Sequence, residues 1–323
     1  MKTCHPSMVL KVLLSVVLAI APTLAMAQYP DRPIRLIVPF APGGASDAAA
    51  RTLGQAMSKS LGQPILIENR PGANGSIAAQ VVQSAPADGY TLLWASASMV
   101  AIPLLQKSAP YQSLNEFAPV SITCRLTYAV YVNADVPAKT IGEFITYARA
   151  KPGKLSYATG SLGEYMVTAQ LLKSAGIDLV HVPYKGGAAA MPDLIAGRVQ
   201  LNIGPFAAGL PHVKAGKLRM LATLLPKRTP AAPDVPTLAE TGVQNVTSPT
   251  WQAIFAPPKT PKNVADRLAK EVALALRDEK LRAQFDGLAV QGESSTPEAL
   301  TVIVNEDTIT WRRFVRENNI PQE

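Results

Sequence analysis

The sequence predicts an α/β protein of two lobes, each a mainly parallel β-sheet flanked by helices. First, the chain has 323 residues, enough for about two domains. Second, short apolar runs alternate with segments of helical periodicity, which is typical of parallel sheets with crossover helices. Third, 48% of the residues are hydrophobic, 17% are charged, and the 28 Pro and 21 Gly follow no repeat. This composition excludes a disordered or fibrous protein.

The first 27 residues have the three parts of a secretory signal peptide. A basic start with Lys2 precedes the apolar run Leu13–Ala21, and the small residues Ala25-Met26-Ala27 form a cleavage site. An uncleaved membrane anchor is the alternative, but the run is shorter than the ~20 residues that span a bilayer. We therefore expect cleavage, export to the periplasm and a mature chain that begins at Gln28.

The charge and cysteine content of the mature chain exclude several classes. Removing Lys2 and Lys11 leaves 29 basic and 23 acidic residues, a net charge of +6. No Lys/Arg run with interleaved aromatic residues is present, so nucleic acid is not expected as a partner. The charge supports only a mild preference for anionic ligands. Cys124 remains as a lone cysteine, which excludes a disulfide scaffold and is expected to be a buried small hydrophobe.

The first lobe is predicted from the start of the mature chain. Strands are expected at Ile34–Val38, Ile65–Ile67 and Thr91–Ala95, and a helix at Ile77–Ser84. Between the first two strands, the apolar residues of a further helix recur at i, i+4 and i+7 from Ala49 to Leu61. Gly62 ends that helix and Pro64 prevents its continuation.

The second lobe is predicted to follow a transition near 120–127. Strands are expected at Ala129–Val132, Leu155–Ala158, Leu179–Val182, Val199–Ile203 and Leu218–Thr223, with helices after the cap Thr140 and at 164–175, 188–196 and 206–215. A Pro-rich connection (226–236) then leads to a strand at Trp251–Phe255, a helix capped at Thr260-Pro261 and a last helix from Pro297. We therefore expect lobe 1 to contain residues 28–125 plus 250–323, and lobe 2 residues 126–249.

The sequence contains few candidate catalytic residues. His181 and His212 are the only histidines of the mature chain, and neither has metal-ligand spacing. His181 lies in an apolar strand and is expected to be structural. No nucleophile elbow, dinucleotide fingerprint or phosphate loop is present. We expect no enzyme activity, metal or cofactor.

Three glycine-rich loops each follow a strand and open a helix. They are Pro42–Asp47, Thr159–Gly163 and Tyr184–Ala188. In a parallel sheet such loops lie at the carboxyl ends of the strands, where ligands bind. Free N–H groups at a helix start bind anions, and glycine lets a ligand approach the backbone. Each loop alone could be a tight turn; the three together predict a carboxylate pocket between the lobes.

Six ordered motifs run through the mature chain and carry a family resemblance. They are Tyr29–Arg35, Val38–Asp47, Glu68–Ser76, Asp88–Leu93, Val182–Gly187 and Ala215–Arg219. With them the chain resembles the Bug (Bordetella uptake gene) solute receptors, the extracytoplasmic binding proteins of tripartite tricarboxylate transporters. The resemblance implies a monomeric periplasmic binding protein of the Venus-flytrap, type II-like fold. It would close on a small organic carboxylate and deliver it to membrane permease subunits.

The resemblance also implies which residues hold the ligand. They are Phe40, Pro42, Gly43, Gly44, Ala45 and Asp47 in the first loop, Ser96 and Ser98 after the third strand, and Thr159, Gly160, Ser161, Glu164, Tyr184, Lys185, Gly186, Gly187 and Ala188 in the second lobe. Backbone groups of the first loop would hold the carboxylate, with Lys185 as the competing anchor. Asp47 would cap the helix or orient a water, and Ser96 and Ser98 would line the wall or cap the strand end.

Two departures from the resemblance affect the expected ligand. Many relatives have His near Met166 and Asp at Gly204, so the pocket is expected to be less polar than usual. An aromatic or other weakly polar acid is therefore favoured over a tricarboxylate. An orphan ligand-sensing receptor acting in signalling and a periplasmic hydrolase are the alternative functions.

Overall fold

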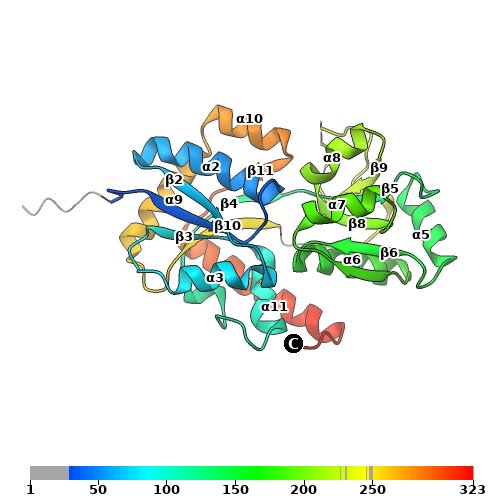
Figure 1. Ribbon diagram of the computed structural model, residues 1–323, viewed down its shortest axis with the longest axis horizontal. Coiled ribbons are helices and arrows are strands. Elements are labelled where there is room, and N and C mark those ends of the chain that lie inside the picture. The colour runs from blue at the N-terminus through cyan, green and yellow to red at the C-terminus, as the bar shows by residue number, and fades with distance from the viewer. Residues whose placement is uncertain (1–28, 226, 230, 245, 247–249, 323) are drawn as a thin grey trace, which may run out of the picture.

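The computed structural model describes residues 29–322 except 226, 230, 245 and 247–249. The protein has two lobes that lie side by side (Figure 1). The first lobe contains a six-stranded sheet in the order β11-β4-β10-β3-β1-β2. Its strands are β1 (Ile34–Val38), β2 (Ile65–Asn69), β3 (Thr91–Ser96), β4 (Ala118–Leu126), β10 (Trp251–Ala256) and β11 (Val290–Gly292). β1 pairs in parallel with β2 and β3, whereas β10 is antiparallel to β3 and β4, and β11 is antiparallel to β4.

The second lobe contains a five-stranded sheet in the order β7-β6-β8-β5-β9. Its strands are β5 (Tyr128–Asn133), β6 (Ser156–Thr159), β7 (Val180–Pro183), β8 (Leu201–Pro205) and β9 (Leu218–Thr223). β6 is parallel to β7 and β8, but β5 is antiparallel to β8 and β9. The two-lobed α/β fold is confirmed. The sheets, however, are mixed rather than mainly parallel: β5, which arrives from the first lobe, and β10, which returns from the second, are each antiparallel to both of their neighbours.

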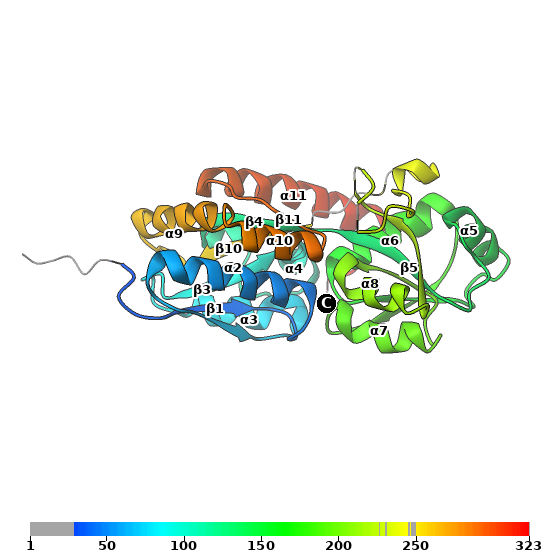
Figure 2. The same ribbon diagram turned by 90° about the horizontal axis from the view of Figure 1, so that it is seen from above.

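Helices flank both sheets (Figures 1 and 2). The first lobe has α2 (Ala45–Leu61), α3 (Ser76–Gln83), α4 (Ile102–Leu105), α9 (Lys262–Ala275), α10 (Glu279–Gly287) and α11 (Pro297–Glu317), and the second has α5 (Ile141–Arg149), α6 (Leu162–Ala175), α7 (Gly187–Ile195) and α8 (Phe206–Lys214). In α2, Leu53 and Met57 are fully buried and Gly62 ends the helix with φ 68°. The predicted face and end of this helix are therefore confirmed.

Three parts of the first lobe differ from prediction. The expected transition near 120–127 is mostly the strand β4, and α10 and β11 lie between the last two predicted helices. Thr260 does not cap α9; its hydroxyl donates to the carbonyl of Pro257, and Pro261 precedes the first helical residue. Proline is tolerated at this helix start because the N–H group that it lacks would have no partner within the helix.

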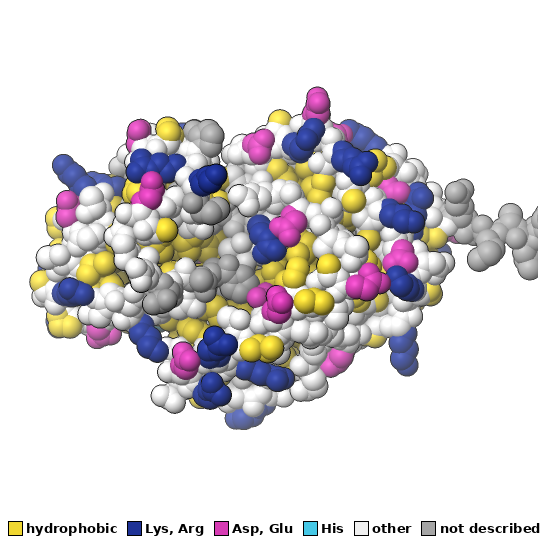
Figure 3. Space-filling view, turned by 180° about the vertical axis from the view of Figure 1, so that it is seen from behind, with side chains coloured by type: hydrophobic (Ala, Val, Ile, Leu, Met, Phe, Trp, Pro, Cys, Tyr) yellow, Lys and Arg dark blue, Asp and Glu magenta, His cyan; other side chains and the backbone are white. Residues whose placement is uncertain are grey.

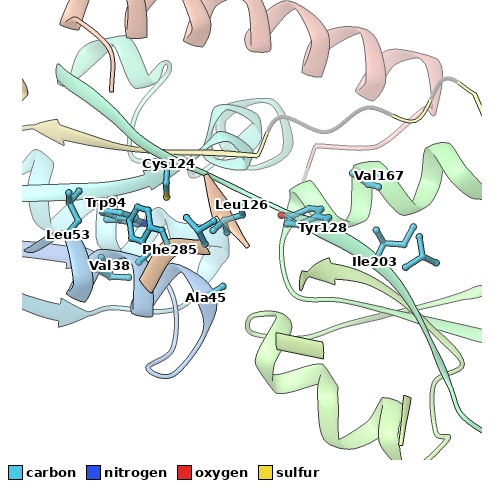
Figure 4. Close-up of a cluster of buried hydrophobic side chains, with 14 of the residues drawn as sticks. Val38, Ala45, Leu53, Trp94, Cys124, Leu126, Tyr128, Val167, Ile203 and Phe285 are labelled. Atoms are coloured by element: carbon cyan, nitrogen blue, oxygen red, sulfur yellow. The ribbon is translucent and has the colours of Figure 1, made fainter. Parts of the chain in front are cut away.

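Two segments connect the lobes. β4 continues through Thr127 directly into β5, and the chain returns through residues 224–250 to β10. The segments meet where the N–H of Leu126 donates to the carbonyl of Thr250 (3.0 Å). Around this crossing, buried apolar side chains of both lobes form one cluster, with Leu126 and Tyr128 between Trp94 on one side and Ile203 on the other (Figure 4).

The surface and the N-terminal segment complete the description. Acidic and basic side chains are interspersed on the face shown in Figure 3, which is hollowed between the lobes. Within the described residues, no helix combines the length and the apolar character needed to cross a membrane. The predicted signal peptide, residues 1–27, lies outside the described part of the chain.

Candidate ligand-binding cleft

A cleft with about 580 Å³ of empty space, part of it open to solvent, lies between the lobes where the two connecting segments cross. Ten of the predicted site residues line it: Phe40, Gly44, Ala45, Ser96, Ser98, Gly160, Ser161, Glu164, Gly187 and Ala188. They come from the start of α2, the end of β3, the start of α6 and the start of α7. The structure thus brings the three glycine-rich loops to one place.

A neighbouring groove contains three further predicted residues. Tyr184, Lys185 and Gly186 line it together with 71–75 of the first lobe. It shares Phe40, Ser98, Gly160 and Ser161 with the cleft. The ammonium group of Lys185 therefore belongs to the rim beside the cleft. Among the residues that line the cleft itself, Glu164 is the one Asp, Glu, Lys, Arg or His.

Asp47 braces the first loop and does not line the cleft. Its Oδ2 accepts from the N–H of Gly43 (3.0 Å) and Nε of Arg51 (3.0 Å), and its Oδ1 from Nδ2 of Asn69 (2.8 Å). Burial alone would raise the pKa of Asp47, but these hydrogen bonds to its charged form outweigh burial and lower it. Asp47 therefore holds the backbone N–H of Gly43 in the turn before α2, and it does not cap the helix as expected, because the N-cap residue Gly44 has no side-chain cap.

Two other predicted residues of this loop, Pro42 and Gly43, also lie outside the cleft lining. The N–H of Gly43 is already donated to Asp47, and Gly43 adopts φ 86°, which favours glycine. It therefore shapes the turn. The N–H group that was expected to be free for a ligand is not free at this position.

The start of α2 presents the remaining free N–H groups to the cleft. Gly44 precedes the helix in an extended conformation (φ −80°), and no side chain caps this end. Within the described residues, the N–H groups of Gly44, Ala45 and Ser46 have no acceptor, because the first helical bond runs from the N–H of Ala48 to the carbonyl of Gly44. The positive end of the helix dipole lies at the same place. This end can bind a carboxylate.

Side chains of the first lobe are fixed around this helix start. The Ser46 hydroxyl donates to Oε1 of Gln252 (3.0 Å), which also accepts from Nε1 of Trp94 (2.8 Å). The hydroxyls of Ser96 and Ser98 lie 2.9 Å apart and hydrogen-bond each other, and neither caps the short 3-10 helix η2 (Ala97–Ala101). Ser96 and Ser98 therefore line the wall, which was the first of their two expected roles.

The second-lobe wall is built by two loops in direct backbone contact. A Cβ on Gly160 would lie 2.1 Å from the backbone of Gly186 and Gly187, so only glycine fits there. Ser161 caps α6 by accepting from the N–H of Glu164 (3.3 Å), and Oε2 of Glu164 accepts from the N–H of Gly160 (2.6 Å). Glu164 thus holds the loop from which it projects.

Glu164 is a buried carboxyl in the cleft wall. Glu164 is 2% exposed. Burial raises the pKa of its carboxyl to about 7, although the hydrogen bonds from the N–H of Gly160 and from the Asn202 amide act to lower that pKa. Tyr128 faces it from β5, and burial followed by the charge of Glu164 raises the pKa of that phenol. Tyr128 therefore remains a neutral hydroxyl at physiological pH.

Thr159 lies behind the cleft rather than in its lining. Its hydroxyl is 2.7 Å from Nε2 of His181, whose ring stacks on Tyr157 with centroids 5.0 Å apart. His181 therefore packs as the structural side chain that was expected. Among the described residues, no group of three or more His, Cys, Asp or Glu is arranged to hold a metal ion.

The two departures used to argue for a less polar pocket do not act in the cleft. Met166 is fully buried in the core that α6 shares with the first lobe, and Gly204 lies within β8 next to Asn202. Neither lines the cleft. The absence of Lys and Arg from the described lining now carries the argument for a weakly polar ligand.

Nine lining residues were not predicted from the sequence. They are Ser46, Ala97, Leu126, Tyr128, Pro205, Ala208, Thr250, Trp251 and Gln252. Ser46 lies inside the predicted loop Pro42–Asp47, although it was not named as a site residue. Most of the others lie at the crossing of the lobes or at strand ends, and no short motif marks them. The ends of the two connecting segments, 126–128 and 250–252, are the signal that could have identified them, since a ligand between lobes must contact the crossing.

Comparison with known proteins identifies the family. A protein-family model described as tripartite tricarboxylate transporter family receptor matches residues 49–320. Protein BugT of Bordetella pertussis is 34% identical, over 92% of this chain and 93% of its own length. The structure of R. palustris Rpa4515 with adipate has a TM-score of 0.86 and 30% identity, covering 91% of this chain and 100% of that one. MatC from Rhodopseudomonas palustris with bound malate has a TM-score of 0.81 and 29% identity, covering 89% and 100%. The chain belongs to the receptor family of the tripartite tricarboxylate transporters, whose members are periplasmic solute-binding proteins.

Proposed function

We propose that this receptor captures a small organic carboxylate by the start of α2 and delivers it to membrane permease subunits without converting it. The observation that carries the proposal is the set of N–H groups at Gly44, Ala45 and Ser46, which open into the cleft between the lobes. Each hydrogen bond from such a group to a carboxylate contributes on the order of 1.5–3 kcal/mol. The adipate and malate in the two related structures support a carboxylate as the ligand.

We further propose that the ligand has one carboxylate and a weakly polar body. The described cleft lining has no Lys or Arg to neutralise further negative charges. Phe40, Leu126 and Trp251 provide apolar surface around the remaining volume. A tricarboxylate would leave two or more anionic groups without a cationic partner, which is costly in a partly desolvated site.

Native mass spectrometry of protein purified from its own periplasm, followed by calorimetry with the identified compound, tests the function. We expect a bound acid of low molecular mass that rebinds to the stripped protein. A compound without a carboxylate would overturn the proposal. Conversion of the compound during incubation would instead favour a periplasmic hydrolase. A neighbouring signalling gene without permease genes would favour a sensory receptor.

A further inference from the structure

A second groove between the lobes lies where the last turns of α11 in the first lobe run beside α6 in the second (Figures 1 and 2). It contains about 1390 Å³ of empty space, part of it open to solvent, and it shares no lining residue with the ligand-binding cleft. Lys173 and Ser174 belong to its α6 side, and Arg313, Phe314 and Glu317 to its α11 side. Each lobe therefore supplies one side of this α6–α11 groove.

The floor of the groove is a contact between the two lobes. Phe314 of α11 is 6% exposed, and its ring meets that of Tyr165 on α6 edge-on, with centroids 6.3 Å apart. Met166 of α6 is fully buried in the same apolar cluster as Trp311 and Phe314 of the first lobe. Because α6 and α11 belong to different lobes, a movement of the lobes changes the width of the groove. A partner seated there would distinguish one arrangement of the lobes from another.

Each side of the groove has an exposed cation without a partner. Within the described residues, the side chains of Lys173 and Arg313 form no ion pair and no hydrogen bond. Glu317, the acid among the lining residues, pairs with neither of them. Two cations that line one groove repel each other, and an acidic partner between them removes that repulsion.

Unpartnered arginines are concentrated at this end of α11. Ten of the fifteen described arginines bond to a carboxylate or a backbone carbonyl of another described residue. The five others are Arg277, Arg282, Arg312, Arg313 and Arg316. Three of these five lie in the last six residues of α11, so the positive potential there is suited to an acidic partner.

We infer that the α6–α11 groove is the docking site for an acidic polypeptide segment of the membrane permease. This inference rests on the proposed delivery of the ligand to permease subunits, and it names the surface and the chemistry of that contact. Lys173 and Arg313 bind acidic side chains of the segment from the two lobes, and Phe314 contacts an apolar one at the floor. Electrostatic complementarity of this kind sets the choice of partner and the rate of association.

The shape of the groove favours a polypeptide over two other anionic partners. A membrane surface is broad and cannot reach the floor between two helices. A single small anion would leave most of the space unfilled. An extended segment, by contrast, can contact Lys173, Arg313 and Phe314 together.

Fluorescence anisotropy with fluorescein-labelled hexaglutamate tests the surface on the whole exported receptor. We expect binding that weakens as salt rises, because exposed charges are screened. Lys173→Gln and Arg313→Gln should each weaken it about two- to fivefold, and the double variant by the product of the two effects. The control is Arg277→Gln with Arg282→Gln, which removes two exposed and unpartnered charges elsewhere in the first lobe and should retain the affinity. Thermal melting establishes that the variants are folded.

Three results of these measurements would overturn the inference. A loss in Arg313→Gln without one in Lys173→Gln would confine the contact to α11 and exclude a site between the lobes. Binding to phosphatidylglycerol vesicles that the double variant loses, without binding of hexaglutamate, would assign this face to a membrane surface. Displacement of the peptide by inorganic phosphate at constant ionic strength would assign the groove to a small anion.

Uptake by cells that lack the wild-type gene separates the inference from the proposed function. The variant Lys173→Glu with Arg313→Glu should bind the acid found by native mass spectrometry as tightly as wild type does in calorimetry. Its uptake of that acid should fall about tenfold or more, because both groove charges are reversed. Normal uptake by this variant would contradict the inference alone. Failure of the wild-type receptor to restore any uptake would contradict the proposed delivery itself.

Discussion

The N–H of Leu126 donates to the carbonyl of Thr250, so the two segments that connect the lobes are joined to each other at the floor of the cleft. Because Leu126 and Thr250 also line the cleft, we expect a molecule bound there to contact the crossing itself. Rotation of one lobe against the other is therefore expected to centre on residues 126–128 and 250.

We propose that residues 28–125 with 250–323 and residues 126–249 move as the two rigid units. A ligand that contacts both units stabilises the closed arrangement by its difference in affinity for the two states. Small-angle scattering with the acid found by native mass spectrometry should show a smaller radius of gyration at saturation. An unchanged profile would indicate a rigid cleft.

Gly44→Val is expected to weaken carboxylate binding on the order of tenfold or more, because the side chain covers the free N–H groups. The backbone tolerates the change: Gly44 has φ −80°, and a Cβ there meets only the carbonyl of Ala41 at 3.8 Å. Lys185→Ala, which alters only the neighbouring groove, should cost about threefold or less. Calorimetry compares them, with Gly287→Val at an exposed position of α10 as the control. The reverse order of effects would assign the carboxylate to Lys185.

Asp47→Asn is expected to destabilise the first lobe by about 1–3 kcal/mol at pH 7, because the N–H of Gly43 and Arg51 lose a charged acceptor. The pKa of Asp47 is lowered in the folded state, so its contribution is present above the pKa of the unfolded chain and is lost as pH falls through the folded pKa. Urea denaturation at pH 7 and in acid measures this. The difference between wild type and variant should shrink in acid.

The control for Asp47 is Asp266→Asn, at an exposed pair with Lys262. Surface pairs of this kind contribute about 0–1 kcal/mol. A loss at Asp47→Asn no larger than that of the control would mean that Asp47 does not brace the loop.

Export is tested by the N-terminal sequence of the mature protein. The apolar run Leu13–Ala21 followed by Ala25-Met26-Ala27 predicts cleavage and a first residue Gln28. Edman degradation or intact mass of the periplasmic form measures it. An uncleaved chain in the membrane fraction would identify the segment as an anchor.

Much of the fold was predictable because it follows local periodicity. The apolar face of α2 repeats every three or four residues, and Thr140 caps α5 through the N–H of Glu143, three residues away. Both signals lie within a short stretch of sequence. β4 was missed because Ser121 and Thr123 alternate with its apolar residues, although both are fully buried. Their polarity is satisfied by distant partners: Thr123, for example, donates to the carbonyl of Gln252. A short sequence window cannot contain such a partner.

The candidate site was predictable where a requirement of the backbone restricts the type of residue, because the restriction then appears as a sequence motif. Glycine at 160 and 187 is required by close approach, and this requirement is visible as a motif. Tyr128 and Trp251 are ordinary strand residues, and they reach the cleft only because the two lobes cross there. The expectation that the N–H of Gly43 is free for a ligand was wrong. In the folded loop the Asp47 side chain turns back and accepts a hydrogen bond from this N–H, which the sequence alone does not show.

The contact between Gly160 and the backbone at Gly186 and Gly187 has a thermodynamic consequence. Two loops in such contact cannot adopt separate ensembles in the free protein, so this wall of the cleft loses little conformational entropy when a ligand arrives. The cost of association then lies mainly in the relative movement of the lobes and in desolvation. Variants of the crossing should therefore alter association rates, while variants of the glycine-rich wall should alter how long the ligand stays.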